Sequence, residues 1–221
     1  MLSIRLVYIF SYNLFQFCGH TWILTNTVVR FLTFGQDALA DTFHSIGLVM
    51  SLCQLLAVLE LFHIADGIEK ALLLPRFIQV LEKNLLLLVL ILAEEVQSKP
   101  VVCLQLFFWN ILDLLRYPHE VMCVMDTPSS CMLWVRYTLW IPIYVLSVIT
   151  EGLTISQATH YLELEASHVR NATASASSSG SPLALVILLP LLALGGTLTV
   201  WQSLIERRHQ MERWAKKIKK K

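Results

Sequence analysis

The stretch R-Y-T-L-W-I-P-I-Y-V-L-S-V-I-T-E, residues 136–151, is apolar enough to cross a lipid bilayer. Within it, Tyr144 and Glu151 lie seven residues apart. Seven residues are close to two turns of an α-helix, so the two side chains share one face, about 10 Å apart along the axis. A carboxylate inside a membrane is costly unless it faces the protein interior or water. Glu151 is therefore a candidate functional residue.

The composition is that of a membrane protein. Hydrophobic residues make up 56% and charged residues 15% of the 221 residues, whereas soluble domains are typically about 25% charged. The mean hydropathy is +0.61, and the apolar residues are spread along the whole chain. These values predict an all-α integral membrane protein with a single helical bundle. The net charge of +1 comes without a folded basic face, so no nucleic-acid partner is expected.

The apolar pattern predicts six transmembrane helices, because each needs about 20 mostly apolar residues. They are expected at residues 4–31, 42–64, 84–95, 100–117, 132–153 and 182–201, packed around a deep cavity. Pro142 is expected to kink the fifth of them. Residues 154–181 form a polar connector whose low-complexity core, A-T-A-S-A-S-S-S-G-S, predicts partial disorder. Residues 202–221 form a basic tail.

The charge distribution predicts the orientation of these spans. Eight of the 17 Lys and Arg residues lie between Arg207 and Lys221, so the tail is expected in the cytosol. Six spans then place both termini in the cytosol and residues 154–181 in the lumen. Asn171 begins a glycosylation sequon on that lumenal connector. The terminal K-I-K-K-K resembles an endoplasmic-reticulum retrieval signal; the alternative is a basic tail attracted to anionic lipid.

Two further pairs of polar residues fall inside predicted spans. Glu60 and His63 are three residues apart, and so are Asp113 and Arg116. Residues at this spacing lie on one helix face, so each pair can satisfy itself as an intrahelical ion pair that holds the bundle together.

Glu151 has no cationic residue three or four positions away. Together with Tyr144 it makes a pair suited to acid–base chemistry. The alternative is a carboxylate at the end of a span that reaches water at the lumenal interface. The residues alone leave both readings open. The five cysteines and the histidines show no metal-ligand spacing, so no metal site is expected.

Several motifs match a known family. L-E-L-F-H-I-A-D-G, residues 59–67, is similar to L-E-x-x-H-x-x-x-G, and W-N-I-L-D-L-L-R-Y, ending at Tyr117, resembles W-x-x-x-E-x-x-R-Y. Gln79-Val80 with Lys83 is similar to the start of a third span. Tyr144 and Glu151 resemble the catalytic Y-P-x-G-x-x-x-E, with Val145 and Ser147 replacing the Pro and Gly. The chain thus resembles the (3R)-3-hydroxyacyl-CoA dehydratases of the endoplasmic reticulum, also called protein-tyrosine-phosphatase-like proteins.

The resemblance implies the third step of very-long-chain fatty acid elongation, in which a 3-hydroxyacyl-CoA loses water to give the trans-2-enoyl-CoA. It implies Tyr144 and Glu151 as catalytic residues, with Glu60, His63, Asp113 and Tyr117 as supporting polar residues. No metal or organic cofactor is needed. The basic residues expected to hold the CoA phosphates at a cytosolic entrance are Arg76, Lys83, Arg116 and Arg136.

The expected partners are the 3-hydroxyacyl-CoA substrate, the lipid bilayer, and elongase and reductase components of the elongation cycle. The substituted Val145 and Ser147 favour an alternative of another class, a catalytically weak membrane adaptor that binds elongation enzymes. A transporter is disfavoured, because the chain shows neither an internal repeat nor paired broken helices.

Overall fold

The computed structural model describes residues 4–68, 72–125, 130–172, 190, 192–205 and 207–208. All regular secondary structure in these ranges is helical, which confirms the predicted all-α class. The helices are α1 (Ile4–Phe34), α2 (Asp37–Ala40), α3 (Thr42–Leu56), α4 (Val58–Ala65), α5 (Leu73–Leu92), α6 (Glu94–Gln97), α7 (Pro100–Val124) and α8 (Ser130–Ala172). A last helix spans Leu192–Ile205.

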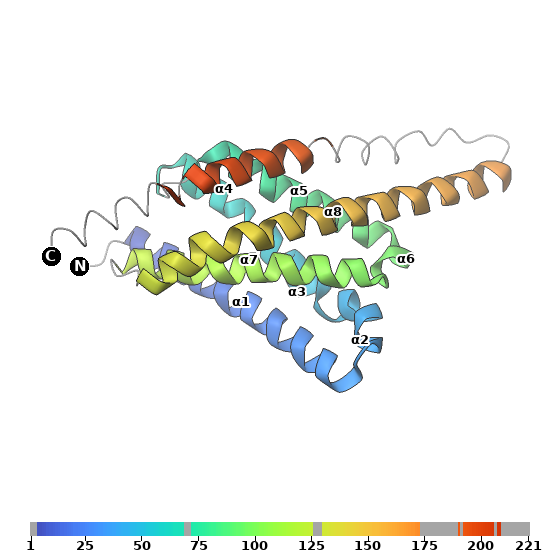
Figure 1. Ribbon diagram of the computed structural model, residues 1–221, viewed down its shortest axis with the longest axis horizontal. Coiled ribbons are helices and arrows are strands. Elements are labelled where there is room, and N and C mark those ends of the chain that lie inside the picture. Colours follow the sequence, from blue (N-terminus) through green and yellow to red (C-terminus); the bar gives the residue numbers. More distant parts are fainter. Residues whose placement is uncertain are drawn as a thin grey trace.

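The long helices run up and down along one axis. One end of the molecule holds the start of α1, the junction of α4 with α5, the end of α7 and the start of α8 (Figure 1). The short helices α2 and α6 lie toward the opposite end, where the neighbouring long helices reverse direction. Consecutive long helices are therefore antiparallel, as short connectors require.

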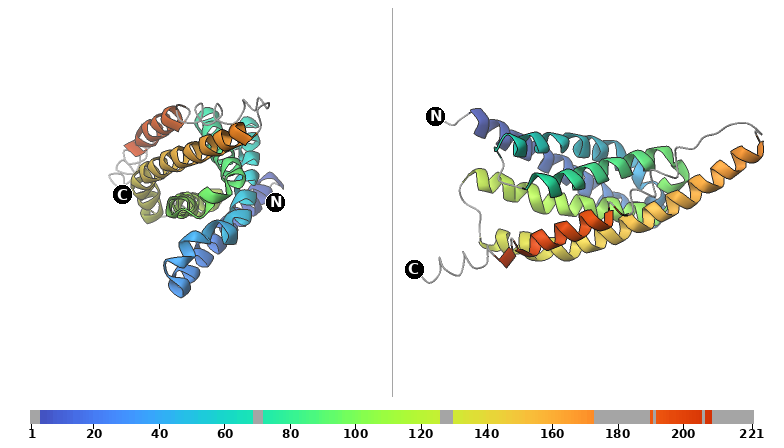
Figure 2. Two further views of the ribbon diagram at one scale, coloured as in Figure 1. Left: turned by 90° about the vertical axis from the view of Figure 1, so that its right-hand side faces the viewer. Right: turned by 90° about the horizontal axis from the view of Figure 1, so that it is seen from above.

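Helix α7 lies at the centre, where it packs against both α1 and α8. The helix Leu192–Ile205 runs alongside α8, whereas α1 and α2 form the opposite edge of the molecule (Figure 2). Two glycines allow this close approach. A Cβ at Gly195 would lie 2.6 Å from Ile78 of α5, and one at Gly196 would lie 3.4 Å from Val148 of α8.

Among the described residues, two helical segments are long and apolar enough to cross a membrane. They are Thr42–Ala65, which joins α3 to α4 and matches the second predicted span, and Trp134–Leu164 within α8, which overlaps the fifth. Large apolar side chains such as Leu48, Leu55 and Phe62 are exposed on the outside of the first segment. Exposed apolar faces of this kind suit a lipid environment better than water.

Two helices extend beyond the spans predicted from hydropathy. Helix α5 begins at Leu73, before the expected start at residue 84, because Arg76 and Lys83 turn inward toward buried acids and do not belong to a solvated connector. Helix α8 continues through Pro142 and past residue 153 to Ala172. Ile155 and Ala158 give this extension an apolar face that packs into the core. The rest of the low-complexity segment and the tail beyond residue 208 lie outside the described residues.

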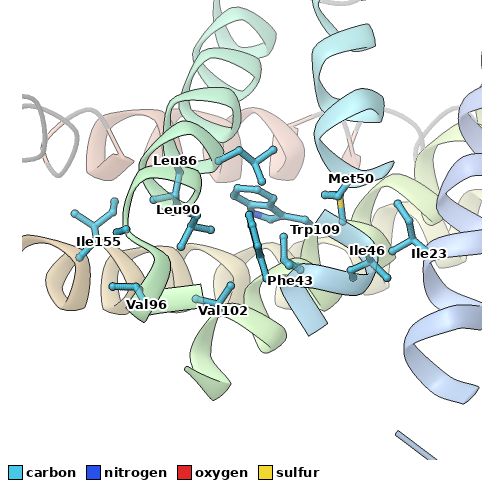
Figure 3. Packing of buried hydrophobic residues seen from close by; sticks show 14 of the residues in the cluster. Ile23, Phe43, Ile46, Met50, Leu86, Leu90, Val96, Val102, Trp109 and Ile155 are labelled. Atoms are coloured by element: carbon cyan, nitrogen blue, oxygen red, sulfur yellow. The ribbon is translucent and has the colours of Figure 1, made fainter. Parts of the chain in front are cut away.

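The apolar core surrounds Trp109 of α7, whose side chain is fully buried. Figure 3 shows the indole between Leu86 and Leu90 on one side and Met50 and Ile23 on the other. These residues come from α5, α3 and α1, so one aromatic side chain contributes to packing among several helices. Its indole N–H reaches beyond this apolar cluster to the polar site described below.

Candidate functional site

The carboxylate of Glu60 on α4 is the most heavily bonded acid in the described part of the chain. Its Oε1 accepts hydrogen bonds from the hydroxyls of Tyr12, at 3.2 Å, and Tyr117, at 2.8 Å. Its Oε2 accepts from Nε and Nη2 of Arg76, at 2.8 and 2.5 Å, and lies 2.7 Å from Nη1 of Arg116. These residues form the Glu60 cluster.

The Glu60 cluster satisfies the physical requirement for a buried charge. An isolated carboxylate is very costly away from water, and it is tolerated when ion pairs and hydrogen bonds surround it. Two guanidinium groups, those of Arg76 and Arg116, face the one carboxylate of Glu60. The cluster lies toward the end of the bundle where α4 meets α5.

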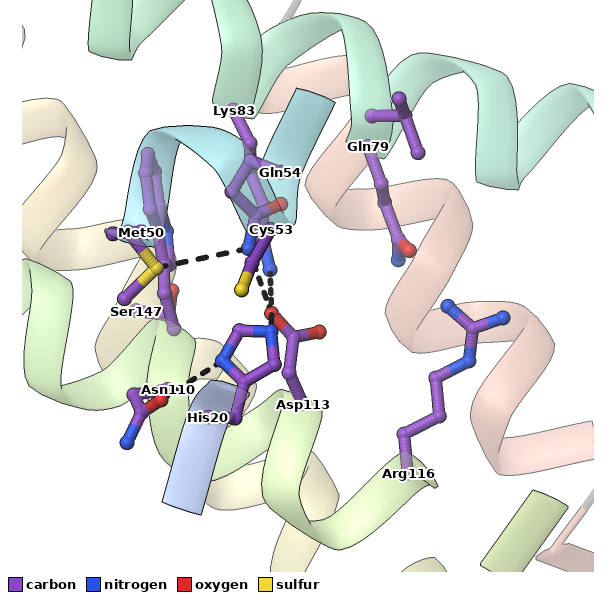
Figure 4. Close-up of polar contacts among 12 residues, drawn as sticks. His20, Met50, Cys53, Gln54, Gln79, Lys83, Asn110, Asp113, Arg116 and Ser147 are labelled. Carbon is purple, nitrogen blue, oxygen red and sulfur yellow. Dashed lines mark hydrogen bonds and ion pairs between the residues drawn. The ribbon is translucent and has the colours of Figure 1, made fainter. Parts of the chain in front are cut away.

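A second buried acid, Asp113 of α7, lies deeper. Its Oδ2 accepts hydrogen bonds from Gln54, at 2.8 Å, and Lys83, at 3.2 Å. The Nε2 of His20 is 3.7 Å away, and Nδ1 of the same ring lies 2.8 Å from Oδ1 of Asn110. Figure 4 shows the side chains of His20, Gln54 and Lys83 converging on Asp113 from three helices.

The described contacts of these acids correct the expectation of intrahelical pairs. Glu60 pairs with Arg76 and Arg116 of other helices. Its expected partner His63 instead lies 3.1 Å from the hydroxyl of Tyr8 and contacts that ring edge-on. Asp113 pairs with Lys83 of α5. Spacing along a helix showed that such pairs were possible, but the packing of the helices decided which pairs form.

The candidate catalytic pair lies on the inward face of α8. Glu151 is 4% exposed and Tyr144 is 6% exposed, so both side chains are inside the bundle rather than at an open span end. Oε1 of Glu151 accepts hydrogen bonds from Nε1 of Trp109 and from Oγ of Ser147, the latter at 2.8 Å. Ser147 stands where the family motif has glycine, and its hydroxyl fixes the orientation of the Glu151 carboxyl.

Tyr144 is held by contacts on both sides. Its ring stacks on Trp140, with centroids 4.7 Å apart and planes 8° from parallel. Its hydroxyl interacts with Thr199 of the last helix and with Gln79 of α5. The guanidinium of Arg136 lies 5.3 Å from the Trp140 ring, on the side toward the start of α8. Arg136, Trp140 and Tyr144 therefore form a row along one helix face.

Motif spacing did not identify all the residues around this pair. The carboxyl of Glu82 on α5 is within hydrogen-bonding range of Glu151. Lys83 extends between the two acid sites, since its ammonium lies 3.2 Å from Asp113 and 5.5 Å from the Trp109 ring centroid. Glu82 precedes the apolar run at residues 84–95 that predicts the third span, so hydropathy alone places it outside the bundle. Its burial depends on helix α5 beginning earlier than hydropathy suggested.

Among the described residues, no group of three or more His, Cys, Asp and Glu side chains is arranged to hold a metal ion. What the arrangement can do is move protons. A buried carboxyl, a buried phenol and a second carboxyl meet between α5 and α8, and carboxyl and phenol groups at one site can act as proton donor and acceptor.

Replacing Glu60 with alanine should destabilise the protein by about 3–5 kcal/mol, because Arg76 and Arg116 would stay buried without their carboxylate. Thermal unfolding of purified protein in detergent micelles measures the effect. Glu95→Ala on α6 is the control, since Glu95 is exposed. Equal stability of both variants would contradict a stabilising role of the Glu60 cluster.

A family model described as "Protein tyrosine phosphatase-like protein, PTPLA" matches residues 54–213. The chain is 49% identical over 158 residues to very-long-chain (3R)-3-hydroxyacyl-CoA dehydratase 4 of Mus musculus, covering 71% of this chain and 68% of that protein. It is 50% identical over 157 residues to the Homo sapiens protein of the same name, with the same shares.

A very-long-chain (3R)-3-hydroxyacyl-CoA dehydratase of Xenopus laevis is 53% identical over 131 residues, covering 59% of this chain and 60% of that protein. No solved structure matches the chain significantly. These findings confirm the family that the motifs resemble. Within that family the motifs look most like the fourth vertebrate paralogue, and the Mus musculus and Homo sapiens relatives carry that number.

Proposed function

The chain belongs to the protein tyrosine phosphatase-like (PTPLA) family, and from this we propose that it is a very-long-chain (3R)-3-hydroxyacyl-CoA dehydratase. It is a membrane protein, as its apolar helices and its family both indicate. The observation that carries the proposal beyond family membership is the site on α8. The carboxyl of Glu151 is buried and held by Trp109 and Ser147, on the same helix as the buried Tyr144.

The reaction breaks a C–H and a C–O bond and forms a C=C bond and an O–H bond of water. The α-carbon next to the thioester loses a proton, the electron pair forms the C=C bond, and the hydroxyl leaves from the β-carbon as water. One group must take the α-proton and another must protonate the departing hydroxyl. We assign to Glu151 the donation of a proton to the departing hydroxyl, and to Tyr144 the acceptance of the α-proton. Because Trp109 and Ser147 both bind Oε1 of Glu151, the transferable proton belongs on Oε2.

The CoA moiety is proposed to enter at the end of the bundle where α8 begins. Arg136 lies on the same face of α8 as Tyr144, closer to that end. Arg76 and Arg116 of the Glu60 cluster lie toward the same end, and guanidinium groups suit phosphate groups. Lys83 lies deeper, on Asp113. The acyl chain would extend among the apolar helices of a six-span bundle with a deep cavity.

We place the protein in the endoplasmic-reticulum membrane with both termini in the cytosol, in line with the basic tail. Asn171, at the far end of α8, is then a lumenal glycosylation candidate. In an elongation cycle the substrate arises by reduction of a 3-ketoacyl-CoA and the product is reduced again. Elongase and reductase components are therefore the partners expected in the same membrane.

Tyr144→Phe and Glu151→Gln should each lower kcat for dehydration by at least about 100-fold, since each removes a proton-transfer group while keeping the side-chain shape. Microsomes from cells that lack their own dehydratase, expressing each variant at equal protein level, would be supplied with a 3-hydroxyacyl-CoA. Formation of the trans-2-enoyl-CoA is the measurement.

The matched controls are Tyr161→Phe and Glu163→Gln, which make the same chemical changes further along α8. Glu163 is exposed and Tyr161 half-buried, so both variants should keep activity. Normal turnover by both Tyr144→Phe and Glu151→Gln would show that the site is elsewhere. An inactive parent chain that co-purifies with elongation components would instead identify a catalytically weak adaptor.

Arg136→Gln should raise KM for the CoA substrate about tenfold, because one charge-assisted phosphate contact is lost. The KM for the matching 3-hydroxyacyl-pantetheine thioester, which lacks the nucleotide phosphates, should stay unchanged. Arg5→Gln, an exposed arginine at the same end of the bundle, is the control. An equal rise of KM for both substrates would contradict phosphate binding by Arg136.

The orientation can be tested with exposed cysteines. A membrane-impermeant maleimide should label Cys123, at the end of α7, in sealed microsomes whose cytosolic face is outward. The label should disappear in Cys123→Ser. A cysteine introduced by Glu95→Cys, at the opposite end of the bundle, should react only after the membrane is permeabilised. The reverse pattern would overturn the proposed topology.

A further inference from the structure

Glu82 is a buried acid to which the proposed reaction assigns no role. It lies on α5, is 3% exposed, and its Oε1 is buried without a hydrogen-bond partner in the described structure. Its Oε2 faces the last helix, 3.6 Å from the position of a Cβ on Gly195. On its remaining side the carboxyl is within hydrogen-bonding range of the Glu151 carboxyl.

The charged and titratable groups around this pair of carboxyls are few. Helix α5 contributes Lys83 beside Glu82, helix α8 contributes Tyr144, and helix α7 contributes Asp113. The described part of the last helix faces Glu82 with Gly195, which carries no charge. Lys83 is already paired with Asp113 at 3.2 Å. Among these groups, Lys83 is the cation near Glu82 and Glu151, and it is shared with Asp113.

Electrostatics decides how many protons such a site holds. Two negative charges about 4 Å apart repel by about 4 kcal/mol near a protein surface, and by more in a drier interior. A carboxyl and a carboxylate in contact, by contrast, gain a strong hydrogen bond when one proton lies between them. With Lys83 neutralised by Asp113, full ionisation would leave two uncompensated charges, whereas one proton between Glu82 and Glu151 leaves a single negative charge that Trp109 and Ser147 stabilise by hydrogen bonds.

We propose that Glu82 and Glu151 form a carboxyl pair that shares one proton, in which Glu82 is a positioning residue that keeps Glu151 ready to act as the acid. The proposal deepens the dehydratase function and rests on it for its role in turnover. Since Trp109 and Ser147 hold Oε1 of Glu151, the shared proton stays on the opposite side of that carboxyl.

The proton count of the pair is restored in each turnover. Glu151 gives its proton to the departing hydroxyl, which leaves as water, and the pair then carries two negative charges. This repulsion favours uptake of a proton. Tyr144 lies within electrostatic reach of both carboxyls. It accepts the proton from the α-carbon and passes its own hydroxyl proton to the pair, so the tyrosine ends neutral and the pair again holds one proton.

Infrared spectroscopy tests the shared proton without relying on catalysis. The purified chain in phosphatidylcholine vesicles should show a C=O stretching band of a protonated carboxyl group that is absent in the Glu82→Gln, Glu151→Gln double variant. In Glu82→Gln, the pH at which this band is lost should fall by at least about one unit, because the second negative charge no longer opposes ionisation of Glu151.

Glu82→Asp keeps two carboxyls and should retain most of the parent's behaviour, which also controls for misfolding. Glu95→Gln changes an exposed glutamate and should leave the band as it is in the parent. A band with the same pH dependence in the parent chain and in Glu82→Gln would overturn the shared proton. So would complete absence of the band in the parent chain near neutral pH.

Kinetics then test the role of the pair in turnover. Glu82→Gln should lower kcat about tenfold with KM little changed, and the upper pH limit of kcat should move down with the infrared band. An unchanged kcat–pH profile would overturn the positioning role. A parent chain that has the shared-proton band but forms no enoyl-CoA would refute the dehydratase function and leave the carboxyl pair standing.

Discussion

The Glu60 carboxylate is the interaction on which the arrangement of the bundle depends. It lies on α4 and binds Tyr12 of α1, Arg76 of α5, and Arg116 and Tyr117 of α7. In a bundle whose outer faces are apolar, contacts between apolar side chains and lipid give alternative helix packings similar stability. A buried charge with several specific donors favours one packing, because any other packing would leave the charge without its hydrogen bonds.

The same reasoning links the Glu60 cluster to the candidate site. Asp113 draws Lys83 inward from α5, and this orients the same turn of that helix so that the adjacent Glu82 reaches Glu151 of α8. Trp109, one turn before Asp113 on α7, fills the apolar core and donates its indole N–H to Glu151. The residues that hold the helices together and the residues around the proposed catalytic pair therefore share α5 and α7. A substitution at Lys83 or Trp109 would affect both stability and turnover.

The hydropathy pattern of the sequence predicted much of the fold. Hydropathy predicted an all-α chain, and the span expected at residues 42–64 coincides with the apolar helix Thr42–Ala65. Helix α5 begins before the third predicted span, although Arg76, Glu82 and Lys83 look like a solvated connector when their partners are unknown. Helix α8 likewise continues past residue 153, where the fifth predicted span ends. Its inward face, with Ile155 and Ala158, is narrow, and the other faces are polar.

By itself, the sequence determined the helical class, the spacing of Tyr144 and Glu151 on one face, and the family, because these depend on residues close together along the chain. Only the tertiary structure decided which charges pair. It joined Glu60 to Arg76 and Arg116 rather than to His63, and it brought Glu82 to Glu151. The physical reason is that a buried charge takes the best partner within a few ångströms, and helix packing determines which side chains are that close.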